Sequence, residues 1–223
     1  MKLAHPELDT VISIDAAPGK VAALVIENRR FFRELLSDIA GQIDGHDGKS
    51  VLSENDVPLA FHRCAELICD MIGFSINRKS LLSKVLDALE KDAMGEDHYL
   101  ESMELLQRVE QYVFTLTKDF TADIVCGKLN MNAILKGVGI SVNDEYDDPL
   151  ERFLDYMELV REFVGEKLFV FVNLRSFFTK EELVPFLETA VAHEYRLLLI
   201  DASAADVLPM ENRLTIDADL CEF

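Results

Sequence analysis

The pattern of apolar and polar positions is clearest in the last third of the chain. Residues 167–172 form a nearly continuous apolar run of strand length, and residues 196–200 form a second one. Between them, Thr179 stands three residues before Glu182, which is typical of a capping box that opens a helix. Two apolar strands joined by a helix indicate a parallel pair buried on both faces. The pattern therefore predicts an α/β fold.

The first fifty residues show a second set of strand and helix signals. Residues 11–14 and 21–26 predict two short strands around residues 16–19, whose Ala-Ala-Pro-Gly sequence is a turn signal. Asn28 then predicts the N-cap of an amphipathic helix. A polar, glycine-rich loop follows, and residues 51–52 predict another short strand.

The middle of the chain changes to helical periodicity. Apolar stripes at helical spacing predict three helices over about 59–71, 81–89 and 99–120, and Asn77 predicts the cap of the second. Such stripes are typical of core or helix–helix packing. The third helix is long for a globular domain, which makes it a candidate protruding element or contact between copies.

The predicted elements divide the chain into two domains. Asp148 followed by Pro149 predicts the start of the last connecting helix, with aspartate as the cap and proline at the first helical position. Residues 1–58 and 149–223 then form an α/β head, and residues 59–148 form an inserted α-helical leg.

Composition narrows the class of protein. About half of the residues are apolar, which is enough for a hydrophobic core, and no apolar run approaches the roughly 20 residues that span a bilayer. The first residues lack the apolar segment of a signal peptide, so we expect a cytoplasmic protein without a membrane partner. The four cysteines show no CxxC spacing and are expected to be reduced thiols.

Two motifs resemble parts of a nucleotide site. Gly48-Lys49-Ser50 matches the end of a P-loop, but Ile43 stands where the motif needs its first glycine. Asp201 follows an apolar strand, as does the acidic residue that holds Mg²⁺ in P-loop ATPases, although a strand-end aspartate that caps or turns the chain is the favoured interpretation. The five histidines fall in no recognised catalytic or metal motif. We expect no bound nucleotide and no enzymatic activity.

Cations are few, because the formal net charge is −19, and they gather in two places. The candidate phosphate-binding residues are Arg29, Arg30 and Arg33 at a predicted helix start, Lys49 in the glycine-rich loop, and Arg78 and Lys79 on the second leg helix. Arginines at a helix N-terminus oppose the macrodipole, so they do not serve helix stability, and they suit phosphate contact. The alternative is ordinary surface charge paired with neighbouring acids.

Several segments resemble one known family. They are Lys167 to Leu183 (KLFVFVNLRSFFTKEEL), the following LLLID at residues 197–201, ILKGVGISV at residues 134–142, and AELICDMIGFSIN at residues 65–77. The chain is similar over nearly its whole length to the CRISPR adaptation protein specific to subtype II-A systems. The resemblance implies a P-loop-ATPase-like α/β head without a functional nucleotide site, and an α-helical leg.

The same resemblance implies a function. The family forms a homotetrameric ring that holds double-stranded DNA by its ends during spacer acquisition. Its implied partners are the other CRISPR adaptation proteins and the RNA-guided nuclease of the locus. It also binds calcium through acidic side chains, and Asp119 and Asp123 match an acid pair at the family's spacing. The next acids expected downstream are replaced at residues 125–128, so further oxygens would come from residues 144–148 or from another subunit, since calcium takes six to eight.

Three functions therefore stay open at this point. The leading hypothesis is a non-catalytic DNA-binding ring, in which a small basic patch in each copy is multiplied around a central hole. Net charge favours an acidic protein-interaction module without DNA contact, because DNA-binding domains are usually basic. A degenerate P-loop nucleotide-binding protein is the third hypothesis, and the missing glycine argues against it.

Overall fold

The chain folds into two compact units. The computed structural model describes residues 1–14, 19–122, 124–203 and 206–223. Unit 1 consists of residues 1–74 and 146–223, and unit 2 consists of residues 75–145. The turn predicted at residues 16–19 falls largely outside the described residues.

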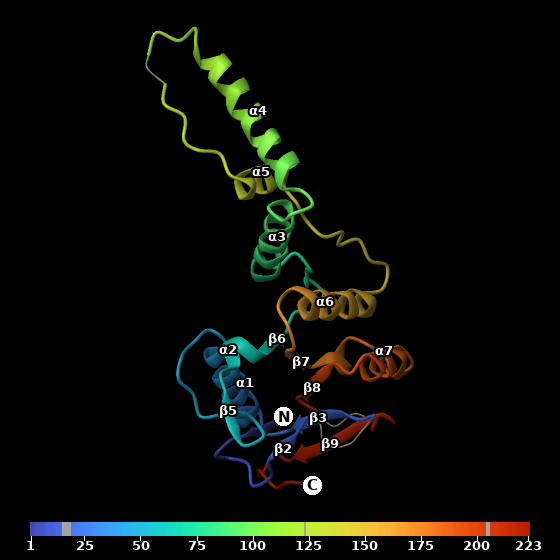
Figure 1. Cartoon of the computed structure of the whole chain (residues 1–223). Helices are drawn as coiled ribbons and strands as arrows, with labels where there is room; N and C mark the ends of the chain where they lie inside the picture. Colours follow the sequence, from blue (N-terminus) through green and yellow to red (C-terminus); the bar gives the residue numbers. More distant parts are fainter. Residues whose placement is uncertain (15–18, 123, 204–205) are drawn as a thin grey trace. The chain divides into compact units, whose positions relative to one another are not determined.

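Unit 1 is an α/β body with two sheets (Figure 1). Its elements in chain order are β1 (Lys2–Ala4), β2 (Ile12–Ser13), β3 (Val21–Ile26), α1 (Arg29–Ile43), β4 (Val51–Glu54), β5 (Val57–Leu59), α2 (Phe61–Cys64), β6 (Ala65–Ile68), α6 (Pro149–Phe163), β7 (Leu168–Val172), the 3₁₀ turn η1 (Leu174–Ser176), α7 (Lys180–Ala192), β8 (Arg196–Asp201) and β9 (Glu211–Ile216). The larger sheet has the order β6-β7-β8-β3-β9, with parallel neighbours throughout. The smaller sheet, β2-β1-β4-β5, is antiparallel. The predicted α/β class and the parallel pairing of β7 with β8 are confirmed.

Helices cover both faces of the parallel sheet. Val170 on β7 points into a core cluster that includes Leu35 of α1. The next residue, Phe171, points to the opposite face, because side chains alternate along a strand. There its ring lies 5.2 Å from Phe153 of α6 and 5.8 Å from Phe186 of α7. Burial on both faces explains why β3 and β7 are continuous apolar runs, and each large side chain contributes about 1.5–3 kcal/mol.

Three helices of unit 1 begin at the caps that the sequence predicts. The Asn28 side chain accepts hydrogen bonds from the backbone N–H groups of Arg30 and Phe31 at the start of α1. Asp148 accepts from the backbone at the start of α6, with proline in the first turn. Thr179 forms the predicted capping box at the start of α7. Each cap satisfies N–H groups that have no partner inside the helix.

Residues 59–71 differ from the prediction. They do not form one helix: α2 is a single short turn, and residues 65–68 form strand β6 in parallel register with β7. Buried Ala65 and Ile68 lie three residues apart, a spacing that suits a helix as well as this edge strand. Pairing with β7 prevails because it satisfies backbone groups that the sheet edge would otherwise leave open. Residues 59–74, which the sequence analysis placed in the helical leg, accordingly belong to unit 1.

Unit 2 is helical. It contains α3 (Lys79–Ala93), α4 (Tyr99–Thr117) and α5 (Met131–Val138). The predicted cap at Asn77 is wrong, because Arg78 occupies the N-cap position of α3. The Asn77 side chain instead donates to the carbonyl of Val142 at 2.9 Å and accepts from its N–H at 2.8 Å. Among the helices that the structure describes, none is both long and apolar enough to cross a membrane.

Candidate nucleic-acid interface

The first two turns of α1 carry three exposed arginines. Asn28 starts the helix directly after β3, so Arg29, Arg30 and Arg33 project from its N-terminal end. The Nε of Arg30 lies 2.8 Å from the Oε1 of Glu34, and this hydrogen bond lowers the pKa of the glutamate. Among the described residues, neither Arg29 nor Arg33 has an ion-pair partner. Two of the three arginines are therefore available to an external anion.

The loop that carries Lys49 is held against α1 by Asp38. The carboxylate accepts the backbone N–H of Lys49 at 2.7 Å and that of Ser50 at 2.7 Å. Partial burial acts to raise the pKa of Asp38, but hydrogen bonds from Ser50, the Lys49 backbone and Gln42 outweigh burial and lower the pKa. Asp38 therefore stays ionised and fixes the position of Lys49 relative to the helix.

This contact also explains the Gly48-Lys49-Ser50 sequence. In a P-loop, the backbone N–H groups of such a tripeptide point at a phosphate. Here they donate to the protein's own carboxylate on Asp38. A Cβ at Gly48 would lie 2.4 Å from both the Asp38 Oδ1 and the Gln42 Nε2, so a larger residue would displace these two side chains. The tripeptide is a clamp between loop and helix.

The clamp brings Arg33 and Lys49 to one hollow of about 260 Å³. The hollow is also lined by His5, Glu34 and Asp38. His5 is buried, its Nδ1 accepts the backbone N–H of Glu7 at 3.2 Å, and burial lowers the pKa of its imidazole. The structure therefore unites two of the predicted cations beside a neutral histidine. Sequence reasoning missed His5, which lies in no motif.

The other two predicted cations belong to unit 2. Arg78 is half-buried at the N-cap of α3, and Lys79 is exposed. Lys79 lines a hollow of about 340 Å³ together with Asp87 and Lys136. The second cation cluster therefore has a lysine that sequence analysis did not single out, contributed by α5.

Of the two predicted metal residues, only Asp119 lies in the part of the chain that the structure describes. α4 ends at Thr117, so Asp119 is exposed beyond the helix. Asp123 lies outside the described residues. Among the residues that the structure does describe, no three histidine, cysteine, aspartate or glutamate side chains gather closely enough to hold a metal ion. Calcium takes six to eight oxygens, so calcium binding at Asp119 and Asp123 stays a prediction that needs further ligands.

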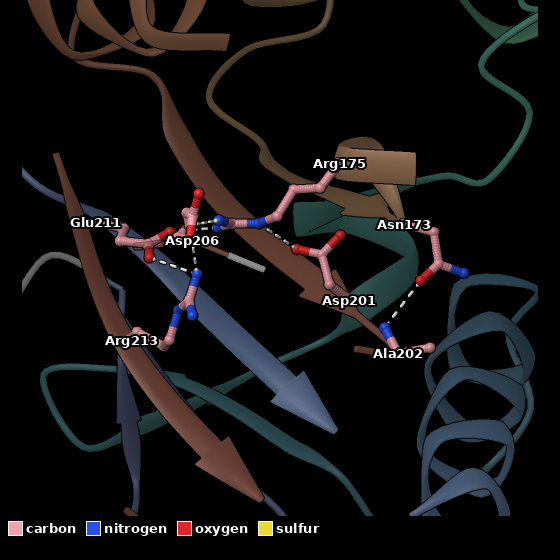
Figure 2. A network of polar contacts seen from close by, with 7 residues as sticks. All are labelled: Asn173, Arg175, Asp201, Ala202, Asp206, Glu211 and Arg213. Carbon is pink, nitrogen blue, oxygen red and sulfur yellow. Dashed lines mark hydrogen bonds and ion pairs between the residues drawn. The ribbon is translucent and has the colours of Figure 1, made fainter. Parts of the chain in front are cut away.

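Asp201 belongs to a buried ionic network (Figure 2). Arg175, on η1, places its Nε 2.8 Å from the Asp201 Oδ2 and also pairs with Glu211 at the start of β9. Arg213 lies 2.7 Å from the other oxygen of Glu211. Burial raises the pKa of Asp201, against the opposing effect of the Arg175 guanidinium. Asp201 is thus paired with Arg175 and has a structural role at the end of its strand.

Arg175 was missed by sequence reasoning, as was β9. Residues 211–216 mix charged, polar and apolar side chains, so they lack the apolar run that predicts a buried strand. They form β9 by pairing with β3, which is distant in the sequence. Asn173, which ends β7, has a positive φ of 55° and accepts the backbone N–H of Ala202 at 2.9 Å. The sequence signal that could have identified Arg175 is its position just after the apolar run of β7, because Asp201 ends the next parallel strand, β8.

The fold and the site together define an α/β protein with an inserted helical unit and cations at one helix start. A family model described as "CRISPR-associated protein (Cas_Csn2)" matches residues 42–220. The chain belongs to this family, the CRISPR-associated adaptation proteins of subtype II-A.

Two relatives agree with this assignment. A CRISPR-associated protein Csn2 from Streptococcus agalactiae is 21% identical over 160 residues, which are 69% of this chain and 68% of the relative. The solved structure described as Stu0660 of Streptococcus thermophilus has a TM-score of 0.56 at 13% identity, covering 97% of this chain and 75% of that one. At this identity the second likeness concerns the fold alone.

Proposed function

We propose that this protein is a non-catalytic, double-stranded DNA-binding component of CRISPR spacer acquisition. It acts as a homotetrameric ring that receives DNA from an end and contacts it through phosphates. The observation that carries the proposal is the placement of Arg29, Arg33 and Lys49 on one side of unit 1 around α1, with no ion-pair partner for either arginine among the described residues. Membership of a CRISPR adaptation family supports it.

Phosphate contact accounts for the kind of residues at this surface. The hollow at Arg33 and Lys49 holds cations and no exposed aromatic side chain that could stack on a base. Arginine and lysine on phosphates fix position without reading sequence. Binding is therefore sequence-independent and weakens with salt, because each phosphate contact releases a counterion.

A ring reconciles DNA binding with the net charge of −19. A few cations in each copy converge on a central hole, and acidic residues elsewhere disfavour binding along the outside. A closed circle of DNA has no end to enter such a hole. The family resemblance implies a P-loop-ATPase-like head, but β3 is joined to α1 by Glu27 and Asn28 alone, which leaves no room for a glycine-rich phosphate loop there.

The experiment is a gel shift of linear and closed-circular duplexes over a salt series, with the oligomeric state measured by sedimentation. Calcium and chelator are compared, because Asp119 and Asp123 alone do not supply the six to eight oxygens that calcium takes. We expect a tetramer that shifts linear DNA only, less strongly as salt rises. The triple variant Arg29→Ala, Arg33→Ala, Lys49→Ala weakens the shift and reduces the salt slope by roughly one per phosphate contact.

The matched control is Lys2→Ala, which removes an exposed cation that is paired with Asp56 at 3.3 Å in the same unit. It keeps the shift. If the triple variant and the control bind alike, the assignment of these cations is wrong. A protein that ignores both DNAs at every salt concentration overturns the DNA proposal and leaves an acidic protein-interaction module as its function.

A further inference from the structure

Unit 2 contains an apolar groove that the DNA proposal does not use. It has a volume of about 500 Å³ and lies between the end of α3, one face of α4 and the segment that leads into α5. In Figure 1 this segment runs back from the far end of α4 toward α5. Leu106 and Met131 are buried in its floor, whereas Leu100 and Met103 are exposed at 76% and 40%. This volume falls within the range of about 300–1,000 Å³ that is typical of ligand sites.

Methionine is concentrated in this groove. Three of the seven methionines line it: Met94 at the end of α3, Met103 on α4 and Met131 at the start of α5. An unbranched thioether side chain adapts its shape to different partners, and methionine-rich surfaces are typical of grooves that receive helices. The chemistry of the floor therefore suits large aliphatic or aromatic side chains.

The rim is acidic. Among the described residues that line the groove, three are glutamates and one is a lysine. Glu90 accepts a hydrogen bond from Asn132 at 2.9 Å, and Glu110 accepts the backbone N–H of Leu129 at 3.0 Å. Glu104 has no partner among the described residues. Each of the three therefore has at least one carboxylate oxygen that accepts no hydrogen bond from the described residues, and an occupant gains by bringing cations.

We infer that this groove docks an amphipathic helix of another protein, with apolar side chains on one face and lysine or arginine beside them. The apolar side chains enter between Met103 and Met131, and the cations meet Glu104 and Glu90. Apolar burial supplies affinity, and the acidic rim selects the charge of the partner. The inference goes beyond the DNA-binding function and does not rest on it.

The α4 helix of a second copy does not fit the groove by charge. α4 itself carries three glutamates and one arginine, so a copy of α4 would place carboxylates against Glu104. The same helix has a separate apolar face for contacts between copies. Leu105, Tyr112 and Leu116 follow helical spacing and lie about 180° around the axis from Met103, at 100° per residue.

The test uses the full chain and a fluorescein-labelled synthetic helix with leucines at i, i+3, i+4 and i+7 and lysines beside them. Fluorescence anisotropy measures its affinity. We expect saturable binding, and Met103→Glu weakens it by about tenfold or more, because it places a charge where an apolar side chain docks. The control Leu105→Glu changes an equally exposed residue on the opposite face of α4 and leaves peptide affinity unchanged.

Charge selection is tested separately. Glu104→Lys weakens the lysine peptide and strengthens an analogue in which glutamate replaces lysine. The inference is overturned if a scrambled peptide of the same composition binds equally well, because an acidic protein attracts any basic chain. It is also overturned if Met103→Glu leaves peptide affinity unchanged, or if it alters sedimentation of the protein, which would make a second copy the occupant. DNA shifts by Met103→Glu stay as in the wild type, so failure here is distinct from failure of the DNA proposal.

Discussion

Arg175 and Asp201 form an ion pair in which both side chains are almost fully withdrawn from water. Their exposed fractions are 7% and 4%, and the Nε–Oδ2 distance is 2.8 Å. The same guanidinium holds Glu211, whose side chain is fully buried. One cation therefore compensates two carboxylates that end β8 and begin β9, and it joins the last strand to the sheet.

Replacing Arg175 by methionine is expected to destabilise unit 1 strongly. Methionine keeps much of the volume but leaves the buried Asp201 carboxylate without its partner and Glu211 with Arg213 alone, which costs about 3–5 kcal/mol. Urea unfolding at pH 7 measures the loss. Arg30→Met is the control, because it breaks an exposed pair and changes stability little. Equal midpoints for the two variants would contradict a structural role for the Arg175–Asp201 pair.

Replacing Asp38 by asparagine is expected to loosen the Lys49 loop. Asparagine keeps one acceptor but loses the charge that binds the Lys49 and Ser50 N–H groups, at a cost of about 1–3 kcal/mol. The pKa of Asp38 is lowered on folding. Its stabilisation is therefore complete above its ordinary pKa of 3.8 and is lost as the pH falls below that value.

Urea unfolding at pH 7 and pH 3 checks this sign. The difference in the free energy of unfolding between the wild type and Asp38→Asn shrinks at pH 3. Asp44→Asn, a change of an exposed carboxylate at the end of α1, is the control and has little effect at either pH. A difference that grows toward acid would show that the clamp does not depend on an ionised Asp38.

Replacing Glu34 by glutamine is expected to strengthen DNA binding. The substitution releases Arg30 from its 2.8 Å pair and removes a negative charge from the rim of the hollow at Arg33. One further phosphate contact steepens the salt dependence by roughly one and raises affinity a few-fold at low salt. Gel shifts over a salt series measure both effects. Glu162→Gln, an equal charge change on exposed α6, should leave the slope unchanged; a gain shared by both variants would reflect net charge alone.

Replacing Asn77 by alanine is expected to destabilise unit 2 alone. Its amide bridges both backbone groups of Val142, and this ties together the two ends of the inserted segment. Losing both bonds costs about 1–3 kcal/mol. Hydrogen exchange should speed up in α3 and α5 while β3 and β7 stay protected. Asn143→Ala, at an exposed neighbour, is the control; uniform acceleration across both units would mean that Asn77 stabilises more than unit 2.

Local hydrogen bonds made much of the fold predictable. The caps at Asn28, Asp148 and Thr179 involve groups within three residues of each other, so the sequence alone determines where α1, α6 and α7 begin. The apolar runs of β3 and β7 likewise follow from burial on both faces. The same reasoning located the cations of α1, because a helix start presents its first turns to solvent.

Tertiary structure decided what depends on distant partners. Whether residues 65–68 form a helix or a strand depended on β7, which lies about a hundred residues later in the chain. Hydrogen bonding to the backbone of β7 favours the strand more than the apolar spacing favours a helix. The partner of Asp201 was equally hidden, since Arg175 pairs with both Asp201 and Glu211 only when β8 and β9 have joined the sheet. Sequence determined the local starts of helices and the apolar strands, and long-range pairing decided the sheet order, the Lys49 clamp and the buried charges.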